Sequence, residues 1–229
     1  MRTPGDLLSA VHNGVNHVVT LGRSTPFATD YKKVRELTMC SHARLKSLYE
    51  GVLEVSGKSV AGDIVECGTA RGGSAALMGL ALKRNGYSQR LWIFDTFEGL
   101  PAPTPEDPIS AHDHTGECRG DIDEVRDALQ RLGVTNIELV KGLVQDTLPA
   151  TETGRIAFLH IDTDWYDSVR ACLETLYERV SVGGIIQIDD YGYWSGAKKA
   201  VEEFFSRRQI SPRLVRIDYA GRRFTKESN

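Results

Sequence analysis

The sequence predicts one α/β domain in which helices cover both faces of a mostly parallel sheet. Its 229 residues are 41% hydrophobic and 26% charged, which is enough to bury one substantial core and is short for two domains. From about residue 60 onward, short apolar segments alternate with segments of helical periodicity, an alternation typical of parallel sheets. Five apolar segments, each ending at or just before a glycine or a polar residue, are expected to be buried strands: residues 64–67, 91–95, 137–140, 156–162 and 185–189.

Three of the expected strands end on a carboxylate, namely Asp95, Asp162 and Asp189. The carboxyl ends of parallel strands meet at one edge of an open sheet, and ligands bind in the crevice outside that edge. We therefore expect these three acids to face one crevice.

Amphipathic helices are expected between the strands. Apolar residues recur at helical spacing over residues 122–132 and 169–180, and each series stops before a glycine. A further helix is expected around residues 197–205. The tail, which contains Ala220 and Gly221, is expected to form an antiparallel hairpin at the edge of the sheet.

The first 60 residues contain no expected strand. Helical periodicity over residues 31–55 predicts helix there, so residues 1–60 are interpreted as a helical cap on an α/β core formed by residues 61–229. Residues 101–113 contain four prolines and predict an irregular loop beside the crevice, where loops usually determine specificity.

Composition and charge disfavour several classes of protein. Twenty-eight Lys and Arg against 31 Asp and Glu leave a net charge of −3, so no basic field is available to bind a nucleic acid. No apolar run approaches the roughly 20 residues needed to span a bilayer, and the start lacks the apolar stretch of a secretory signal. A cytoplasmic protein that binds no membrane is therefore expected. The four cysteines are scattered, with no CxxC pair, and are assigned no chemistry.

A glycine-rich turn follows the first expected strand, where residues 66–74 read ECGTARGGS. Ala70 replaces the second glycine of the dinucleotide fingerprint, and the turn has no lysine for a nucleoside triphosphate, so neither cofactor class is favoured. S-adenosylmethionine fits better, because Glu66 could offset its ammonium group and Asp95 could accept both ribose hydroxyls. The structural alternative is that Glu66 caps a helix and the glycines only allow close packing.

Four carboxylates are expected at the crevice, because the fourth expected strand leads into Asp162 and Asp164 and the fifth ends at Asp189 and Asp190. Like charges this close repel one another, and a divalent cation that prefers oxygen ligands, most simply Mg²⁺, relieves the repulsion. Asp162, Asp189 and Asp190 are the expected ligands. No cysteine or paired histidine accompanies them, which disfavours structural zinc. The alternative for Asp164, and more strongly for Asp167, is helix capping.

Five motifs follow one another between residues 35 and 205: GDIVECGTARGGS at 62–74, FDTFEGLP at 94–101, GLVQDTLP at 142–149, HIDTDWYDS at 160–168 and GGIIQIDDYG at 183–192. In this combination and order they resemble the macrocin O-methyltransferase family of the TylF and MycF type. The set is far more specific than any one glycine turn.

The resemblance implies a Rossmann-like class I methyltransferase sheet with an antiparallel last strand, S-adenosyl-L-methionine as methyl donor, and Mg²⁺. It implies as acceptor a hydroxyl of a sugar on a secondary metabolite, and a homo-oligomer built through the cap. The metal ligands again fall on Asp162, Asp189 and Asp190. The residues expected to bind the cofactor are Thr38, Met39, Glu66, Gly68, Thr69, Arg71, Gly73, Ser74, Asp95, Thr96, Phe97, Gly142, Asp146 and Asp162.

Methyl transfer to an alcohol needs a base, because the hydroxyl holds its proton far above neutral pH. The candidates are Asp164, two residues from a metal ligand, and His112 or His114 on the loop over the crevice. The sequence does not choose between them, and solvent exposure is the alternative for either histidine. The related catechol-type enzymes carry a lysine base where this chain has Trp165.

Two other functions stay open at the level of sequence. Asp162 and Asp164 form a DxD pair, which in sugar-nucleotide glycosyltransferases holds a metal-bound diphosphate, although Gly68 and Asp95 describe an adenosine site. The second alternative is a partner subunit that binds S-adenosylmethionine without catalysis. The complete set of expected ligands argues against it.

Overall fold

The computed structural model describes residues 25–227, and within them seven strands form one sheet in the order β3-β2-β1-β4-β5-β7-β6. The pairs from β3 to β5 are parallel, and β7 runs antiparallel to both β5 and β6. The expected fold class is therefore confirmed. The strands are Asp63–Cys67 (β1), Leu91–Asp95 (β2), Ile137–Lys141 (β3), Ile156–Ile161 (β4), Val180–Ile188 (β5), Val215–Arg216 (β6) and Arg222–Thr225 (β7).

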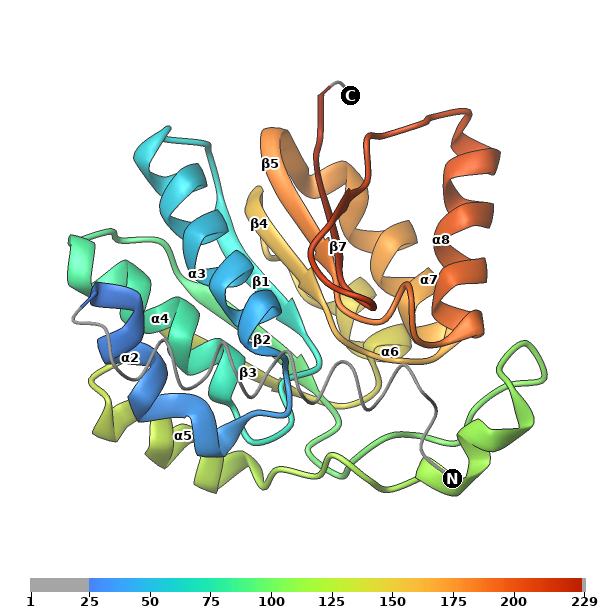
Figure 1. Cartoon of the computed structure of the whole chain (residues 1–229), viewed down its shortest axis with the longest axis horizontal. Helices are drawn as coiled ribbons and strands as arrows, with labels where there is room; N and C mark the ends of the chain where they lie inside the picture. Colours follow the sequence, from blue (N-terminus) through green and yellow to red (C-terminus); the bar gives the residue numbers. More distant parts are fainter. Residues whose placement is uncertain (1–24, 228–229) are drawn as a thin grey trace.

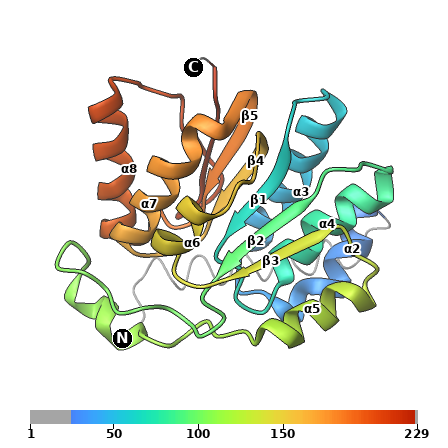
Figure 2. The same ribbon diagram turned by 180° about the vertical axis from the view of Figure 1, so that it is seen from behind.

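Helices cover both faces of the sheet, with α2 to α5 on one face and α6 to α8 on the other (Figures 1 and 2). The helices are Pro26–Val34 (α2), His42–Gly57 (α3), Gly73–Asn85 (α4), Ile122–Arg131 (α5), Val144–Ala150 (α6), Tyr166–Leu176 (α7) and Ser195–Arg208 (α8). Short 3₁₀ turns lie at Arg35–Leu37, Ile109–His114 and Tyr177–Arg179. No helix in the described part of the chain is long and apolar enough to cross a membrane.

A buried apolar layer lies on each face of the sheet. Phe158 in β4 packs beneath α3 and α4 together with Leu48 and Leu77, whereas the next residue, Leu159, belongs to the layer under α7 and α8 with Phe204. Successive strand residues point to opposite faces, so a central strand must be apolar on both. This explains the continuous apolar runs in the sequence.

The strand order reverses between β1 and β4, and this reversal leaves a crevice at the carboxyl ends of the strands. The N–H of Asp162 donates to the carbonyl of Cys67 (2.8 Å), and that of Asp189 to the carbonyl of Ile161 (2.9 Å). The ends of β1, β4 and β5 are thereby held side by side, which places their terminal acids at one edge.

The helix expected over residues 31–55 is two helices. α2 ends at Val34, Thr38 is extended (φ −142°, ψ 148°), and α3 begins after Ser41, whose hydroxyl accepts the N–H of Arg44 (3.1 Å). Both helices pack on α4, so the apolar periodicity continues across the break and hides it in the sequence. Residues 1–24 of the expected cap lie outside the described residues.

The boundary between α7 and β5 also differs from the expectation. The apolar series that reaches Val180 predicted a helix, but α7 ends at Leu176 and Val180 begins β5. Gly183 and Gly184 lie inside this strand, where Gly183 has φ +82° and the register against β4 shifts. A left-handed glycine accommodates such an irregularity. The expected hairpin at the tail is confirmed as β6 and β7.

Candidate active site

A cavity of about 360 Å³ opens at the carboxyl ends of the central strands, between the cap and the loop after β2. Its volume falls within the range of small-molecule sites. Most residues predicted from the sequence line it: Thr38, Met39, Gly68, Thr69, Ser74, Asp95, Thr96, His114, Gly142, Asp162, Asp164, Asp189 and Asp190.

Asp95 at the end of β2 fixes the glycine-rich turn. Its Oδ2 accepts the backbone N–H groups of Thr69 (2.7 Å) and Ala70 (3.0 Å), and its Oδ1 accepts that of Phe97 (2.7 Å). Burial raises the pKa of Asp95 more than these donors lower it. The carboxylate thus orders the turn that borders the cavity.

The turn also lies directly against the tip of β4. Gly68 has φ +86°, and a Cβ atom there would lie 1.8 Å from the carbonyl oxygen of Asp162. Only glycine permits both the backbone conformation and this close approach. The glycine-rich turn and the first aspartate therefore touch through their backbones.

Four aspartates converge on the cavity, as the sequence predicted. Ligand atoms of Asp162, Asp164 and Asp190 lie within 4.8 Å of one another, and so do those of His160, Asp162 and Asp189. Burial and the neighbouring carboxylates raise the pKa of Asp162 and Asp164 well above the ordinary range, and that of Asp190 to about 6. Carboxylate oxygens that repel one another in this way are suitable ligands for a hard divalent cation. Asp162 belongs to both groups.

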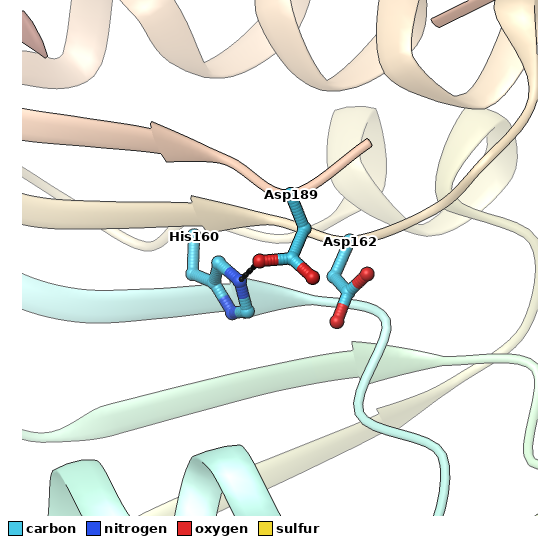
Figure 3. Close-up of side chains that lie close together, drawn as sticks. All are labelled: His160, Asp162 and Asp189. Carbon is cyan, nitrogen blue, oxygen red and sulfur yellow. Dashed lines mark hydrogen bonds and ion pairs between the residues drawn. The ribbon is translucent and has the colours of Figure 1, made fainter. Parts of the chain in front are cut away.

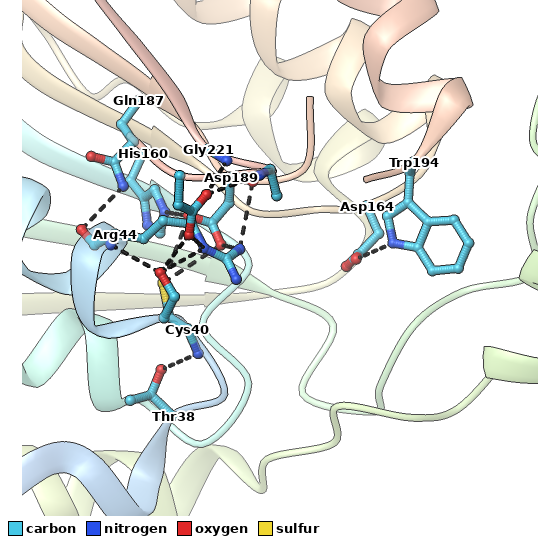
Figure 4. Close-up of polar contacts among 12 residues, drawn as sticks. Thr38, Cys40, Arg44, His160, Asp164, Gln187, Asp189, Trp194 and Gly221 are labelled. Carbon is cyan, nitrogen blue, oxygen red and sulfur yellow. Dashed lines mark hydrogen bonds and ion pairs between the residues drawn. The ribbon is translucent and has the colours of Figure 1, made fainter. Parts of the chain in front are cut away.

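Asp189 differs from its neighbours because two cationic side chains hold it (Figure 4). Arg44 of α3 forms an ion pair with Oδ2, and the Nε2 atom of His160 lies 3.4 Å from Oδ1. Burial alone would raise the pKa of Asp189, but Arg44 and His160 outweigh it and lower the pKa to about 2. The guanidinium of Arg44 also pairs with Asp218 of the hairpin (3.2 Å), so it joins the cap, the hairpin and β5.

Glu66 does not face the cavity, contrary to its expected role beside an ammonium group. Its side chain is fully buried under the cap helix, and Oε1 lies 2.9 Å from the Nδ1 atom of His160. The reason is strand geometry, because Glu66 pairs in register with His160 and both side chains project to the same face of the sheet. Glu66 caps no helix either.

Asp164 borders the cavity and does not cap α7. Its Oδ1 accepts the indole N–H of Trp194 (2.9 Å; Figure 4), and its backbone is left-handed at φ +60°. Asp107 of the proline-rich loop caps α7 instead, since its Oδ1 accepts the N–H of Tyr166 (2.9 Å). Asp167, the other residue expected to cap, forms an ion pair on the surface of α7. Helix capping was therefore the wrong interpretation for both acids.

Five further predicted residues lie away from the cavity lining. Arg71 donates to a carbonyl of the cap (3.2 Å), and Gly73 lies beneath the segment that follows α2. Phe97 is buried in the core, while Asp146 and His112 are exposed. Their proximity to the turn and the loops could be predicted from the sequence, but the direction of each side chain could not.

Comparison with known proteins gives a consistent result. The model of the macrocin-O-methyltransferase (TylF) family matches residues 20–226. The chain is 34% identical over 192 residues to the 8-demethyl-8-(2,3-dimethoxy-alpha-L-rhamnosyl)-tetracenomycin-C 4'-O-methyltransferase of Streptomyces olivaceus, covering 80% of this chain and 73% of that protein. It is 32% identical over 193 residues, with the same coverage, to the demethyldecarbamoylnovobiocin O-methyltransferase of Streptomyces niveus. Among solved structures, the O-methyltransferase NovP matches with a TM-score of 0.79 and 25% identity, over 96% of this chain and 100% of that one.

The chain belongs to the macrocin-O-methyltransferase (TylF) family. It is an O-methyltransferase that depends on S-adenosylmethionine, which decides against a glycosyltransferase and against a subunit without catalysis. An O-methyltransferase of Bacillus cereus solved in complex with SAH shares its fold, with a TM-score of 0.61 at 17% identity over 96% of this chain and 99% of that one.

Several residues at the site of this methyltransferase were missed by the sequence reasoning. Arg44 and His160 are basic residues inside apolar patterns, and that position is a signal, because a buried charge requires a partner. The aromatic residues Tyr193, Trp194 and Tyr219 had no such signal in the sequence. They meet only because the fold brings the segment after β5 beside the hairpin. The missed residues at or beneath the cavity are Cys40, Arg44, Cys118, Gln145, His160, Tyr193, Trp194 and Tyr219.

Proposed function

We propose that this enzyme methylates a hydroxyl of a sugar carried by a secondary metabolite, and that it uses a divalent cation, most simply Mg²⁺. The observation that carries the proposal is the gathering of four carboxylates in one cavity with the glycine-rich turn. The named relatives support the acceptor class, since one is a methyltransferase of a rhamnosyl-tetracenomycin and another is mycinamicin III 3''-O-methyltransferase from Micromonospora griseorubida.

The cofactor is assigned to the part of the cavity bordered by the glycine-rich turn and the cap. Asp95 offers carboxylate oxygens to the ribose hydroxyls, and Thr38 and Met39 close the site from the cap. At the adenine side of the cofactor we place Gln145 instead of its neighbour Asp146, which the family resemblance had included among the cofactor-binding residues. Gln145 lines the cavity and its buried Oε1 has no hydrogen-bond partner among the described residues, whereas Asp146 is exposed.

The cation is assigned to Asp162, Asp189 and Asp190. All three line the cavity, and a carboxylate oxygen of Asp162 lies within 4.8 Å of one from each of the other two. When bound, such an ion would hold the acceptor hydroxyl and lower its pKa. Asp164 is the base we favour, because its carboxylate lies beside this group and Trp194 holds it in place. His114 is engaged with Glu117 (2.7 Å), and His112 lies outside the lining of the cavity.

The acceptor is assigned to the aromatic side of the cavity. Tyr193, Trp194 and Tyr219 form a continuous wall, with ring centroids 4.8 Å apart for Tyr193 and Trp194 and 6.0 Å apart for the two tyrosines. Tyr193 is 46% exposed, so part of its face is open to a ligand. Aromatic faces beside a few polar groups suit the apolar face and the hydroxyls of a sugar.

The test is a screen of glycosylated metabolites with S-adenosylmethionine, in which the product gains the mass of one methylene group. Asp189→Ala is expected to lower turnover by at least about 100-fold, because the loss of cation binding removes about 3 kcal/mol or more of transition-state stabilisation. Its affinity for S-adenosylhomocysteine should stay within a few-fold of the wild type. Asp167→Asn, a surface acid on α7, is the matched control.

Retention of activity by Asp189→Ala, or by the wild type in excess chelator, would remove the metal from the proposal. If no glycoside is methylated but aglycones are, the sugar is not the acceptor and that part of the proposal fails. The two results are independent, so each part of the proposal is tested separately.

A further inference from the structure

A row of fully buried polar side chains crosses the sheet under the cap helix α3. Glu66 of β1, His160 of β4 and Gln187 of β5 are register partners on adjacent strands, and each is 0% exposed. Their neighbours on the same face, such as Phe158 and Ile185, are apolar. Ionised groups in such surroundings cost several kcal/mol each unless they are paired, so the row requires an explanation.

His160 links two carboxylates within this row. Its Nδ1 atom lies 2.9 Å from Oε1 of Glu66, and its Nε2 atom lies 3.4 Å from Oδ1 of Asp189 (Figure 3). An ionised carboxylate only accepts hydrogen bonds, so both ring nitrogens act as donors and the imidazole carries a positive charge. The chain Glu66–His160–Asp189 therefore runs from the interior of β1 to the edge of the cavity.

We propose that His160, anchored by Glu66, is a positioning residue that fixes the carboxylate of Asp189 for a divalent cation in the cavity. The inference rests on the proposed function, because it takes Asp189 as a ligand of that cation. His160 itself is not the ligand, since both of its nitrogens already face carboxylates and it does not line the cavity.

The arrangement of contacts around Asp189 supports this role. His160 approaches Oδ1 and Arg44 approaches Oδ2, so each oxygen of the carboxylate is held by a different basic side chain. Residues that hold a metal ligand in this way typically change metal affinity by about 10–100-fold when they are removed. A buried ion pair, by contrast, adds little net stability and is often replaced by apolar residues without loss.

A positioning residue should therefore affect metal affinity much more than stability, whereas a structural residue should affect stability. The informative variant is the double substitution Glu66→Leu and His160→Phe, which removes both charges together and leaves no unpaired acid beside the ring. We expect it to fold with a thermal midpoint close to that of the wild type. Its Mn²⁺ affinity, measured by electron paramagnetic resonance on the protein bound to S-adenosylhomocysteine, should fall by about 10–100-fold.

Two further variants make the result specific. His160→Gln has a single amide NH₂ group in place of the two ring nitrogens on opposite sides of the imidazole, so it should recover only part of the lost Mn²⁺ affinity. Gln187→Leu removes the next polar residue of the same row, whose side-chain hydrogen bond within the described residues goes to the carbonyl of Arg44 (3.4 Å) and not to a carboxylate. It should leave Mn²⁺ affinity unchanged. All the variants should bind S-adenosylhomocysteine with an affinity close to that of the wild type.

The inference is overturned if the double variant binds Mn²⁺ within about twofold of the wild type, or loses no more affinity than Gln187→Leu. If the double variant does not fold, His160→Gln decides by the same criterion. If the wild type binds S-adenosylhomocysteine but no Mn²⁺ or Mg²⁺, the metal part of the proposed function fails and this inference fails with it. Failure of the inference alone therefore shows as metal binding by the wild type, with no loss of affinity specific to the His160 variants.

Discussion

Gly73 at the start of α4 provides a quantitative test of how closely the cap lies on the glycine-rich turn. A Cβ atom at this position would lie 2.7 Å from the backbone carbon of Leu37 and from Cβ of Thr38. Ordinary contacts begin at 3.4 Å, so Gly73→Ala must displace the cap segment by about 0.7 Å. No φ strain contributes, because this glycine begins a helix, so the whole cost arises from overpacking, which is typically about 1–3 kcal/mol.

Thr38 lines the cavity, so the same displacement should weaken cofactor binding. We expect Gly73→Ala to lower the free energy of unfolding in urea by about 1–3 kcal/mol and to weaken S-adenosylhomocysteine in calorimetry. The control is Gly57→Ala at the end of α3, where the added Cβ meets only the hydroxyl of Tyr87 at 3.5 Å. It should gain up to about 1 kcal/mol from helix propensity. If Gly73→Ala matches Gly57→Ala in stability and in binding, the close packing of the cap is refuted.

The remaining predictions concern two polar contacts. Burial alone would raise the pKa of Asp30, but hydrogen bonds from Arg84 and Lys33 outweigh it and lower the pKa below its ordinary value of 3.8. This contribution to stability is therefore present above pH 3.8 and is lost as the pH falls further. Arg84→Met should lower the unfolding free energy by about 1–3 kcal/mol at pH 7. In urea titrations the difference from the wild type should shrink below pH 3.8, and a difference that stays constant there would contradict the assignment. Trp194→Phe retains an aromatic ring but loses the N–H group that donates to Asp164. We expect kcat to fall about tenfold, because that factor corresponds to the free energy of one hydrogen bond to a charged group. The KM for the cofactor should not change. Trp165→Phe, which loses a bond to the carbonyl of Pro101 (2.8 Å), should affect stability instead, and equal kcat losses in both variants would argue against a specific role for Trp194.

Much of the fold could be predicted because local patterns and tertiary structure agree. The apolar runs ending in Asp95, Asp162 and Asp189 fixed three strands and the edge at which they meet. Their convergence follows from the parallel arrangement alone. The tail could be predicted as a hairpin because its turn residues separate two short strands.

The direction of single side chains could not be predicted in the same way. An acid inside a buried strand requires a partner, and for Glu66 the sequence reasoning supplied a ligand where the structure has His160. The register of β1 against β4 decides between the two, and register depends on contacts far apart in the chain. Arg44 was missed for the same reason, since its partners Asp189 and Asp218 lie more than a hundred residues away.

The hairpin formed by β6 and β7 has a consequence for engineering. Because the aromatic wall is the proposed acceptor site, Tyr219 offers a position at which a library could alter acceptor preference. Asp218 and Gly221 of the same turn are less tolerant: Asp218 accepts the N–H groups of Ala220 (2.9 Å) and Gly221 (2.7 Å), and a Cβ atom on Gly221 would come within 2.9 Å of Arg44. Randomising the whole turn would therefore disturb the arginine that holds Asp189, and variants selected for a new acceptor would lose turnover for an unrelated reason.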